Sequence, residues 1–242
     1  MRRIVVSAEI LAGNEVVLTG DPFHHLFRVL RMKSGDEVLL LDGQGGCCRC
    51  RIGRVESRRA ALTVVERWTE EEKVIPIRLI QGLPKGDKFD FILQKGTEVG
   101  VSVFAPVIME RSVPLLKGEN GQQRFARWRR IVDEAARQCR RPRVPEIQPL
   151  VDLASALEDG AGGLRLLCWE EGSRLLGEVL PGSRPARVTV LIGPEGGFTA
   201  PEVALALEAG YAPVRLGPRV LRTETAGIVI AAWLQFLYGD MG

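Results

Sequence analysis

The residues best suited to chemistry lie in two loops near the C-terminus, and the first of these is rich in glycine. Residues 193–197 read Gly-Pro-Glu-Gly-Gly, between an apolar run at 188–192 and a helix predicted over 199–209. Parallel α/β proteins bind ligands at the carboxyl ends of strands, and glycine lets a ligand approach the backbone closely. The loop lacks the Gly-x-Gly-x-x-Gly pattern and the Lys-Ser/Thr of phosphate-binding loops. The residues alone therefore leave two interpretations open, a cofactor loop and a structural turn.

The second loop, residues 216–222, joins a short strand predicted at 213–216 to a helix predicted over 223–238. It combines a Gly-Pro turn with two arginines, of which Arg222 directly precedes the helix. The helix is apolar nearly all round, which predicts burial in a core or an interface. A polar loop in front of a buried helix favours a site at the helix N-terminus. An ordinary loop with solvated arginines is the alternative.

A third segment, residues 124–143, holds eight arginines against Asp133 and Glu134, a local charge of +6. At 100° per residue its apolar side chains fall on one helix face and most arginines fall on the opposite face. The planar guanidinium group binds phosphate with two parallel hydrogen bonds. The pattern therefore predicts contact with RNA or another polyanion, and a merely solvated helix face is the alternative. The opposite-face arginines are Arg127, Arg130, Arg137 and Arg141.

Further basic residues lie in the N-terminal part of the chain. Residues 49–59 hold five arginines against Glu56, a local charge of +4. A small β-rich module with basic edges is typical of a nucleic-acid-docking domain. The other basic residues of this part are Arg2, Arg3, Arg28 and Arg31.

Two further patterns carry no predicted metal or catalytic site. Cys47, Cys48 and Cys50 have no second Cys or His pair at zinc spacing, so we predict no metal site. The two histidines, His24 and His25, form no Ser-His-Asp constellation.

Two kinds of secondary structure must position these residues. Short β-type runs at 15–18, 37–41 and 61–65 predict a small barrel or sandwich over residues 1–70. A charged stretch at 66–73 reads as a linker. From residue 74 to 242, strands and helices alternate, which predicts an α/β domain with a largely parallel sheet.

Composition limits the class of protein. The 242 residues contain 33 Lys and Arg against 30 Asp and Glu, a formal net charge of +3, which excludes a histone-like polybasic protein. The apolar stretch at 225–238 is too short for a membrane span. The basic N-terminus is not followed by the apolar region of a signal peptide. Five cysteines in this setting indicate reduced thiols, and we expect a cytoplasmic protein.

Six segments resemble the RsmE family of bacterial RNA methyltransferases, in order along nearly the whole chain. The segments are HHLFRVLR at 24–31, QKGTEVGV at 94–101, ERSV at 110–113, EAARQCRR at 134–141, GPEGG at 193–197 and LGPRVLRTETA at 216–226. One such segment is weak evidence, whereas six in register are highly specific.

The resemblance implies a SPOUT methyltransferase domain over 74–242, with a trefoil-knotted and mostly parallel sheet, after a PUA-like β-barrel domain over 1–70 that assists RNA docking. It implies S-adenosyl-L-methionine as cofactor, N3 of a uridine in small-subunit (16S) ribosomal RNA as acceptor, and a homodimer with the active site near the interface. The cofactor would lie among three loops, and its predicted contacts are Leu167, Cys168, Trp169, Ile192, Gly193, Pro194, Gly196, Gly197, Leu216, Gly217, Val220, Leu221 and Thr223. The predicted RNA-binding residues are Arg2, Arg3, His25, Arg28, Arg31, Arg127, Arg130, Arg137 and Arg141.

The implied reaction assigns roles to a few charged residues. Methyl transfer from a sulfonium needs the acceptor nitrogen held close to the methyl group. Uracil N3 is a poor nucleophile until its proton leaves, and negative charge then builds on the flanking carbonyl oxygens. Arg222 or Arg111 is predicted to stabilise that charge. Glu98 or Glu195 is the predicted general base.

Two other functions remain open from the sequence. One is ribose 2′-hydroxyl methylation of RNA by the same fold. The other is a non-catalytic RNA-binding ribosome-assembly factor that retains the fold. The presence of both chemistry-bearing loops favours an enzyme, because a pure RNA binder has no physical need for them.

Overall fold

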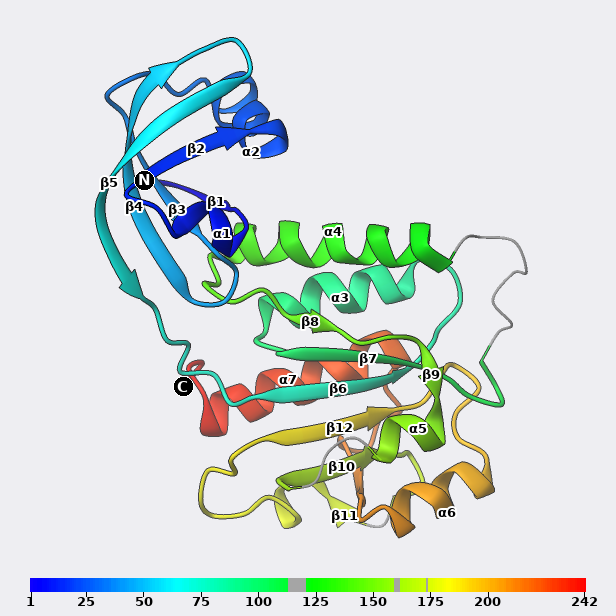
Figure 1. Cartoon of the computed structure of the whole chain (residues 1–242). Coiled ribbons are helices and arrows are strands. Elements are labelled where there is room, and N and C mark those ends of the chain that lie inside the picture. Colours follow the sequence, from blue (N-terminus) through cyan, green and yellow to red (C-terminus); the bar gives the residue numbers. More distant parts are fainter. Residues whose placement is uncertain (113–120, 159–161, 173) are drawn as a thin grey trace. The chain divides into compact units, whose positions relative to one another are not determined.

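The computed structural model describes residues 1–112, 121–158, 162–172 and 174–242 (Figure 1). Val113, which ends the ERSV segment, lies outside the described residues. Contacts within the chain divide it into two units, residues 1–72 with 136–144 and residues 73–135 with 145–242. The domain boundaries predicted from the sequence place residues 136–144 in the second domain, whereas their contacts lie in the first unit.

The first unit is built on a five-stranded sheet in the order β1-β3-β4-β5-β2. β1 pairs with β3 in parallel, and the other neighbouring strands are antiparallel. Alternate side chains form its core, among them the fully buried Leu18, Leu40 and Leu62. Its elements are β1 (Arg2–Val5), α1 (Ala8–Leu11), β2 (Glu15–Thr19), α2 (Gly20–His24), the π-helical turn η1 (His25–Val29), β3 (Glu37–Leu41), β4 (Gly46–Val55) and β5 (Arg59–Thr69).

The end of β5 corrects the predicted linker. Residues 66–73 are predicted to form a charged linker, but β5 continues to Thr69, and Glu66 lies opposite Arg49 of β4. The two side chains form an ion pair of 2.9 Å. Charged residues are compatible with a strand here because this part of β5 is exposed. Charge density alone therefore did not distinguish a solvated strand from a linker.

An almost buried ion pair fastens residues 136–144 to the first unit. Arg141 donates from Nε and Nη2 to the Glu72 carboxylate at 3.0 and 2.9 Å, and the two side chains are only 10% and 8% exposed. The helix α4 (Gly121–Cys139) ends before Arg141. Arg141 is therefore not on the exposed helix face that the 124–143 pattern predicts.

Two of the clustered cysteines belong to the core of the first unit. Cys48 and Cys50 of β4 are buried, and their Sγ atoms lie 3.4 Å apart. Burial, followed by the contact with Cys48, raises the pKa of Cys50 to about 12. Side chains two residues apart on a strand share one face. The Cys-x-Cys spacing here therefore reflects a strand packed on a core.

The second unit is an α/β domain, and all its paired strands among the described residues are parallel. The strand order is β11-β13-β10-β12-β6-β7-β8, with β9 beside β7. The strands are β6 (Ile77–Gly82), β7 (Val103–Ile108), β8 (Glu146–Ile147), β9 (Val151–Asp152), β10 (Leu164–Cys168), β11 (Arg174–Leu175), β12 (Val188–Ile192) and β13 (Ala212–Arg215). The helices are α3 (Lys88–Glu98), α4, α5 (Leu153–Glu158), the short 3-10 helix η2 (Leu176–Glu178), α6 (Ala200–Glu208) and α7 (Thr223–Tyr238). The predicted α/β class with a largely parallel sheet is confirmed.

Successive side chains of β6 face different helices. Ile80 joins a core cluster with Leu157 of α5 and Val203 of α6. Its neighbour Leu79 faces α7, where a Cβ atom added to Gly227 would lie 3.2 Å from Leu79. Glycine at this position lets α7 lie close against the sheet (Figure 1). None of the described helices combines the length and the apolarity that a membrane crossing requires.

A buried glutamine fixes the C-terminal part of α7. Gln235 is fully buried, and its Oε1 accepts a hydrogen bond from the Ile75 N–H at 2.9 Å. Its Nε2 donates to the carbonyl oxygens of Ile75 and Gly100 at 3.0 and 2.9 Å. One side chain thus pairs three backbone groups, two in the segment before β6 and one in the loop after α3, that would otherwise lack partners.

Gln235→Leu is expected to lower the free energy of unfolding by about 2–4 kcal/mol, because it leaves buried backbone groups unpaired. Denaturant unfolding of the full chain measures the change. The control is Gln138→Leu, at an exposed position of α4, which should change stability by less than about 0.5 kcal/mol. Equal stability of the two variants would contradict the role given to Gln235.

Candidate active site

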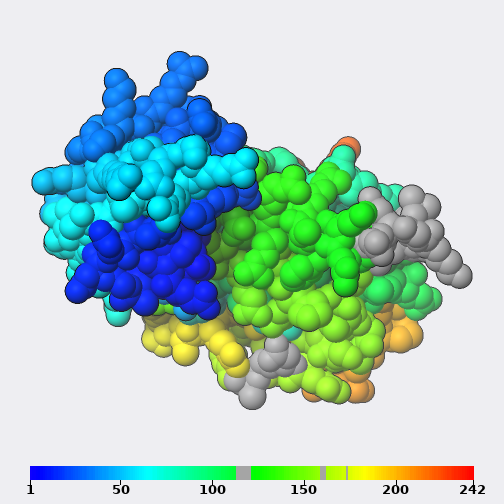
Figure 2. Space-filling model, turned by 45° about the horizontal axis from the view of Figure 1, so that its top comes forward, coloured from blue at the N-terminus to red at the C-terminus, as the bar shows by residue number. Residues whose placement is uncertain are grey.

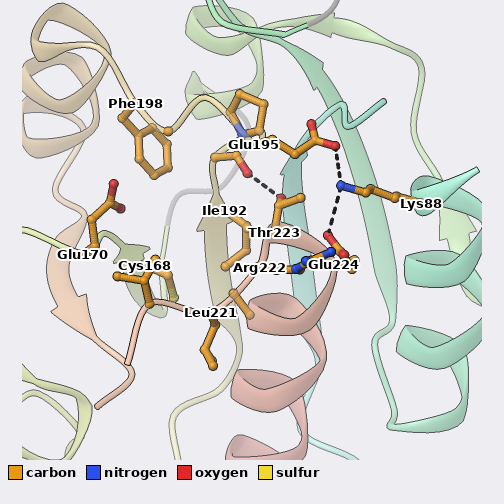
Figure 3. A pocket seen from close by; sticks show the side chains of 15 residues that line it. Lys88, Cys168, Glu170, Ile192, Glu195, Phe198, Leu221, Arg222, Thr223 and Glu224 are labelled. Carbon is orange, nitrogen blue, oxygen red and sulfur yellow. Dashed lines mark hydrogen bonds and ion pairs between the residues drawn. The ribbon is translucent and has the colours of Figure 1, made fainter. Parts of the chain in front are cut away.

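A cavity of 410 Å³ opens at the carboxyl ends of β10 and β12 (Figure 3). We call it the β12 pocket. Its lining residues are Lys88, Cys168, Glu170, Ile192, Gly193, Pro194, Glu195, Gly197, Phe198, Val220, Leu221, Arg222, Thr223, Glu224 and Ala226. A smaller cavity of 110 Å³, the β13 pocket, adjoins it and shares Cys168, Glu170, Val220, Leu221 and Ala226. The two loops singled out by the sequence thus meet at one place.

The hydroxyl group of Thr223 ties three elements together beside the pocket. Its Oγ1 donates to the Gly193 carbonyl oxygen at 2.6 Å and accepts from Gln81 Nε2 at 2.8 Å. Thr223 and Gln81 are both buried. Because Gln81 lies on β6, Gly193 follows β12 and Thr223 begins α7, these two hydrogen bonds set the distance between the two loops.

The glycine loop is braced from its outer side. Arg111 donates from Nη1 to the carbonyl oxygens of Gly196 and Phe198 at 2.9 and 3.1 Å. Glu202 accepts from the Thr199 N–H at 2.8 Å and from the Glu110 N–H at 2.9 Å. The loop can therefore keep its shape without a ligand.

Charged groups gather at one side of the β12 pocket (Figure 3). Lys88 Nζ lies 2.8 Å from Glu195 Oε1 and 3.7 Å from Glu224 Oε2. Glu195 also accepts from the Lys85 N–H at 3.1 and 3.2 Å. Partial burial alone would raise the pKa of the Glu195 carboxyl, but the hydrogen bonds from Lys88 and the backbone outweigh it and hold that pKa below its usual value. A carboxylate stabilised in this way is a weak base.

Most residues predicted to contact the cofactor line one of the two cavities. The exceptions are Leu167 and Gly196. Leu167 is fully buried in the core of the sheet, and the Gly196 carbonyl is held by Arg111. Those that do line a cavity are Cys168, Trp169, Ile192, Gly193, Pro194, Gly197, Leu216, Gly217, Val220, Leu221 and Thr223.

The predicted catalytic residues divide into two groups. Arg222 and Glu195 line the β12 pocket. Arg111 and Glu98 line neither cavity. Arg111 binds loop carbonyls, and Glu98 is exposed and pairs with Lys95 on α3 at 2.8 Å. The structure therefore brings together only half of the predicted catalytic set.

Lys88, Glu170, Phe198 and Glu224 line the pocket but were not among the predicted site residues. Glu224 lies inside the LGPRVLRTETA segment, and this membership could have marked it as a candidate site residue. Lys88 had no such signal, because its relevance depends on how the first turn of α3 lies against α7.

The residues predicted to bind RNA lie in both units. Arg2, Arg28 and Arg31 are exposed in the first unit, and burial followed by the charge of Arg137 lowers the pKa of His25 there. The surface drawn in green in Figure 2 includes α4. Arg130 of this helix is exposed. Arg127 is paired with Asp87 at 2.9 Å and with Asp90. The arginines thus differ in how much of their charge is already neutralised.

Two family models match the chain. A model described as an RNA methyltransferase domain matches residues 70–235, and one described as an RNA methyltransferase PUA domain matches residues 18–65. Two similar curated proteins are both called ribosomal RNA small subunit methyltransferase E. The protein of Synechocystis sp. is 39% identical over 240 residues, which are 97% of this chain and 77% of that protein. The protein of Bacillus subtilis is 35% identical over 92% of each chain.

Solved structures with the same arrangement include two with a bound cofactor. A ribosomal RNA small subunit methyltransferase E from Neisseria gonorrhoeae, bound to S-adenosyl methionine, has a TM-score of 0.90 and 34% identity and covers 100% of both chains. A methyltransferase from Legionella pneumophila in complex with the same cofactor has a TM-score of 0.88 and 31% identity over 98% of both chains.

Thr223→Val is expected to lower the free energy of unfolding by about 1–3 kcal/mol, because it leaves the Gly193 carbonyl and one N–H of the Gln81 amide unpaired. Thr223→Ser keeps the hydroxyl group and should retain most of the stability. Thermal unfolding of both variants measures the difference, with Thr225→Val on the same helix as control. If Thr223→Val were as stable as Thr223→Ser, the hydroxyl would not hold the loops.

Proposed function

This chain belongs to the ribosomal RNA small subunit methyltransferase E family, and from this membership we propose that it transfers a methyl group from S-adenosyl-L-methionine to N3 of a uridine in small-subunit (16S) ribosomal RNA. The resemblance seen in the sequence is thereby confirmed, as is a methyltransferase domain preceded by a PUA-like domain. The observation that carries the proposal is the β12 pocket, where the two loops of the family pattern meet at the carboxyl ends of the strands.

The two adjoining cavities suit S-adenosyl-L-methionine in size and lining. Together they fall in the range of about 300–1,000 Å³ that is usual for small-molecule sites. Ile192, Leu216 and Leu221 offer apolar surface, and Glu170 offers a carboxylate. Thr223 holds the loops that form the walls. When bound, the cofactor supplies a methyl group on a positively charged sulfur.

Arg222 is proposed to act on the acceptor. Its guanidinium is exposed, lines the β12 pocket and makes no ion pair within the described part of the chain. A free cation at this place can stabilise negative charge on an acceptor carbonyl oxygen. Arg111 is proposed to act indirectly, because it holds the glycine loop from outside.

The same proposal includes a homodimer. Apolar side chains of α7 and α3 are exposed, with Trp233 at 44%, Phe236 at 62% and Phe91 at 47%. Clustered exposed aromatic groups are typical of protein interfaces. A second copy of the chain is the proposed partner, in the cytoplasm where ribosomes are assembled.

A trefoil knot in the second unit is also part of the proposal. After β13, which lies at the β10 side of the sheet, the chain returns through residues 216–222 to α7, which packs against β6 and β12. This return past the loop after β12 supports a knotted path.

The expected outcome for the intact chain is stoichiometric binding of S-adenosyl-L-methionine by calorimetry and methylation of small subunits from a strain that lacks this gene. Mapping the methyl group on the ribosomal RNA should give one 3-methyluridine. A 2′-O-methylated ribose would replace the proposal by its enzymatic alternative. Absence of cofactor binding would leave the non-catalytic assembly factor.

Neutralising the exposed arginines of α4 should weaken RNA binding. Arg129→Gln combined with Arg130→Gln is expected to reduce the slope of log affinity against log salt by about 0.7–0.9 per lost phosphate contact. Binding of small-subunit ribosomal RNA across a salt series measures it. The matched control is Arg174→Gln, at an exposed position of β11. An unchanged slope would remove α4 from the RNA footprint.

A further inference from the structure

One carboxylate oxygen in the β12 pocket is buried without a hydrogen bond. Glu224 Oε2 has no hydrogen-bond partner in the described part of the chain, and the Glu224 side chain is 15% exposed. The nearest cation is Lys88 Nζ, at 3.7 Å. A buried acceptor without a partner is costly, and such groups in a pocket commonly await a ligand.

The other carboxylates suit proton transfer less well. Glu195 has both oxygens engaged by Lys88 and the Lys85 N–H. Glu98 lines neither cavity. Glu170 is exposed and lies beside Phe198 and Cys168, across the pocket from Glu224 (Figure 3).

Two cationic side chains lie on the same side of the pocket as Glu224. In Figure 3 Lys88, Glu224 and Arg222 lie at the same side of the pocket. The charges of Glu224 and Arg222 both act on the pKa of Lys88, the first raising it and the second lowering it. This side of the pocket therefore offers one acceptor together with two donors. The edge of uracil around N3 presents the complementary set, a carbonyl oxygen, the N3–H donor and a second carbonyl oxygen. Cytosine has no proton on N3, and a ribose hydroxyl has no flanking carbonyls.

We propose that Glu224 binds the N3–H of the acceptor uridine and takes its proton, while Lys88 and Arg222 donate to the two carbonyl oxygens. The proposal rests on the proposed uridine N3 specificity and names the residues that produce it. The N3 electron pair forms the new bond to the methyl carbon, the bond from that carbon to sulfur breaks, and its electron pair stays on sulfur. The N3 proton passes to the Glu224 carboxylate and then to solvent.

The test compares two RNA substrates. Small subunits are reconstituted on transcribed ribosomal RNA that carries either uridine or 5-fluorouridine. Fluorine withdraws electrons and makes N3–H more acidic, so the reaction depends less on a protein base. Glu224→Gln keeps the shape of the side chain and removes the proton acceptor. We expect it to bind S-adenosyl-L-methionine like the unchanged chain and to lose about 10²–10⁴-fold in turnover on uridine RNA. It should recover much of that loss on 5-fluorouridine RNA.

The matched control is Glu208→Gln, at an exposed position of α6 outside the pocket, which should keep full turnover on both RNAs. Lys88 provides a second, independent pair of variants. Lys88→Gln should lower turnover, and Lys88→Arg, which keeps a donor, should restore it. This pair tests the donor half of the proposal even if Glu224→Gln fails to bind the cofactor.

The outcomes separate this inference from the proposed function. If the unchanged chain forms no 3-methyluridine, the proposed function itself fails. If it forms 3-methyluridine but Glu224→Gln is fully active, or is equally impaired on both RNAs, Glu224 is not the base. If Lys88→Gln keeps full turnover, or if Lys88→Arg restores none of the turnover that Lys88→Gln loses, Lys88 is not the proposed donor.

Discussion

The site depends on one buried hydroxyl group. Thr223 Oγ1 links the Gly193 carbonyl and the Gln81 amide, and so joins the end of β12, the end of β6 and the start of α7. Without these hydrogen bonds, the two loops that line the β12 pocket would have no direct polar connection at this point. In a dry environment each of the three groups needs the others, since an unpaired buried polar group is expensive. The pocket walls are thereby set before any ligand arrives.

Much of the second unit could be predicted from its sequence. The helix α7 begins and ends where the apolar pattern predicts, and Ile192 ends β12 as expected. The glycine loop was found because strand, glycines and helix follow one another directly along the chain. Such elements can be predicted because residues adjacent in the sequence determine them.

The parts that could not be predicted all depend on contacts between distant segments. Arg141 was predicted to lie on an exposed helix face and to bind RNA, because its sequence neighbours give no sign of Glu72, with which it pairs almost out of solvent. The place of Lys88 in the pocket could not be predicted, because it depends on α3 and α7 lying side by side. In that arrangement its ammonium group lies close to both Glu195 and Glu224. The local charge of +6 counted from the sequence also overstates the positive charge of α4, since Arg127 is already paired with Asp87 and Asp90.

The two anchors of α7 have a consequence for how this helix can vary. Thr223 fixes one end at the pocket and Gln235 fixes the other end at Ile75 and Gly100. At a rise of about 1.5 Å per residue, the anchors are spaced by about 18 Å. Removing or adding one residue between them would rotate one anchor by about 100° relative to the other, and no loop within the helix can absorb the error. The number of residues between the two anchors is therefore fixed, whatever side chains the exposed positions of this stretch carry.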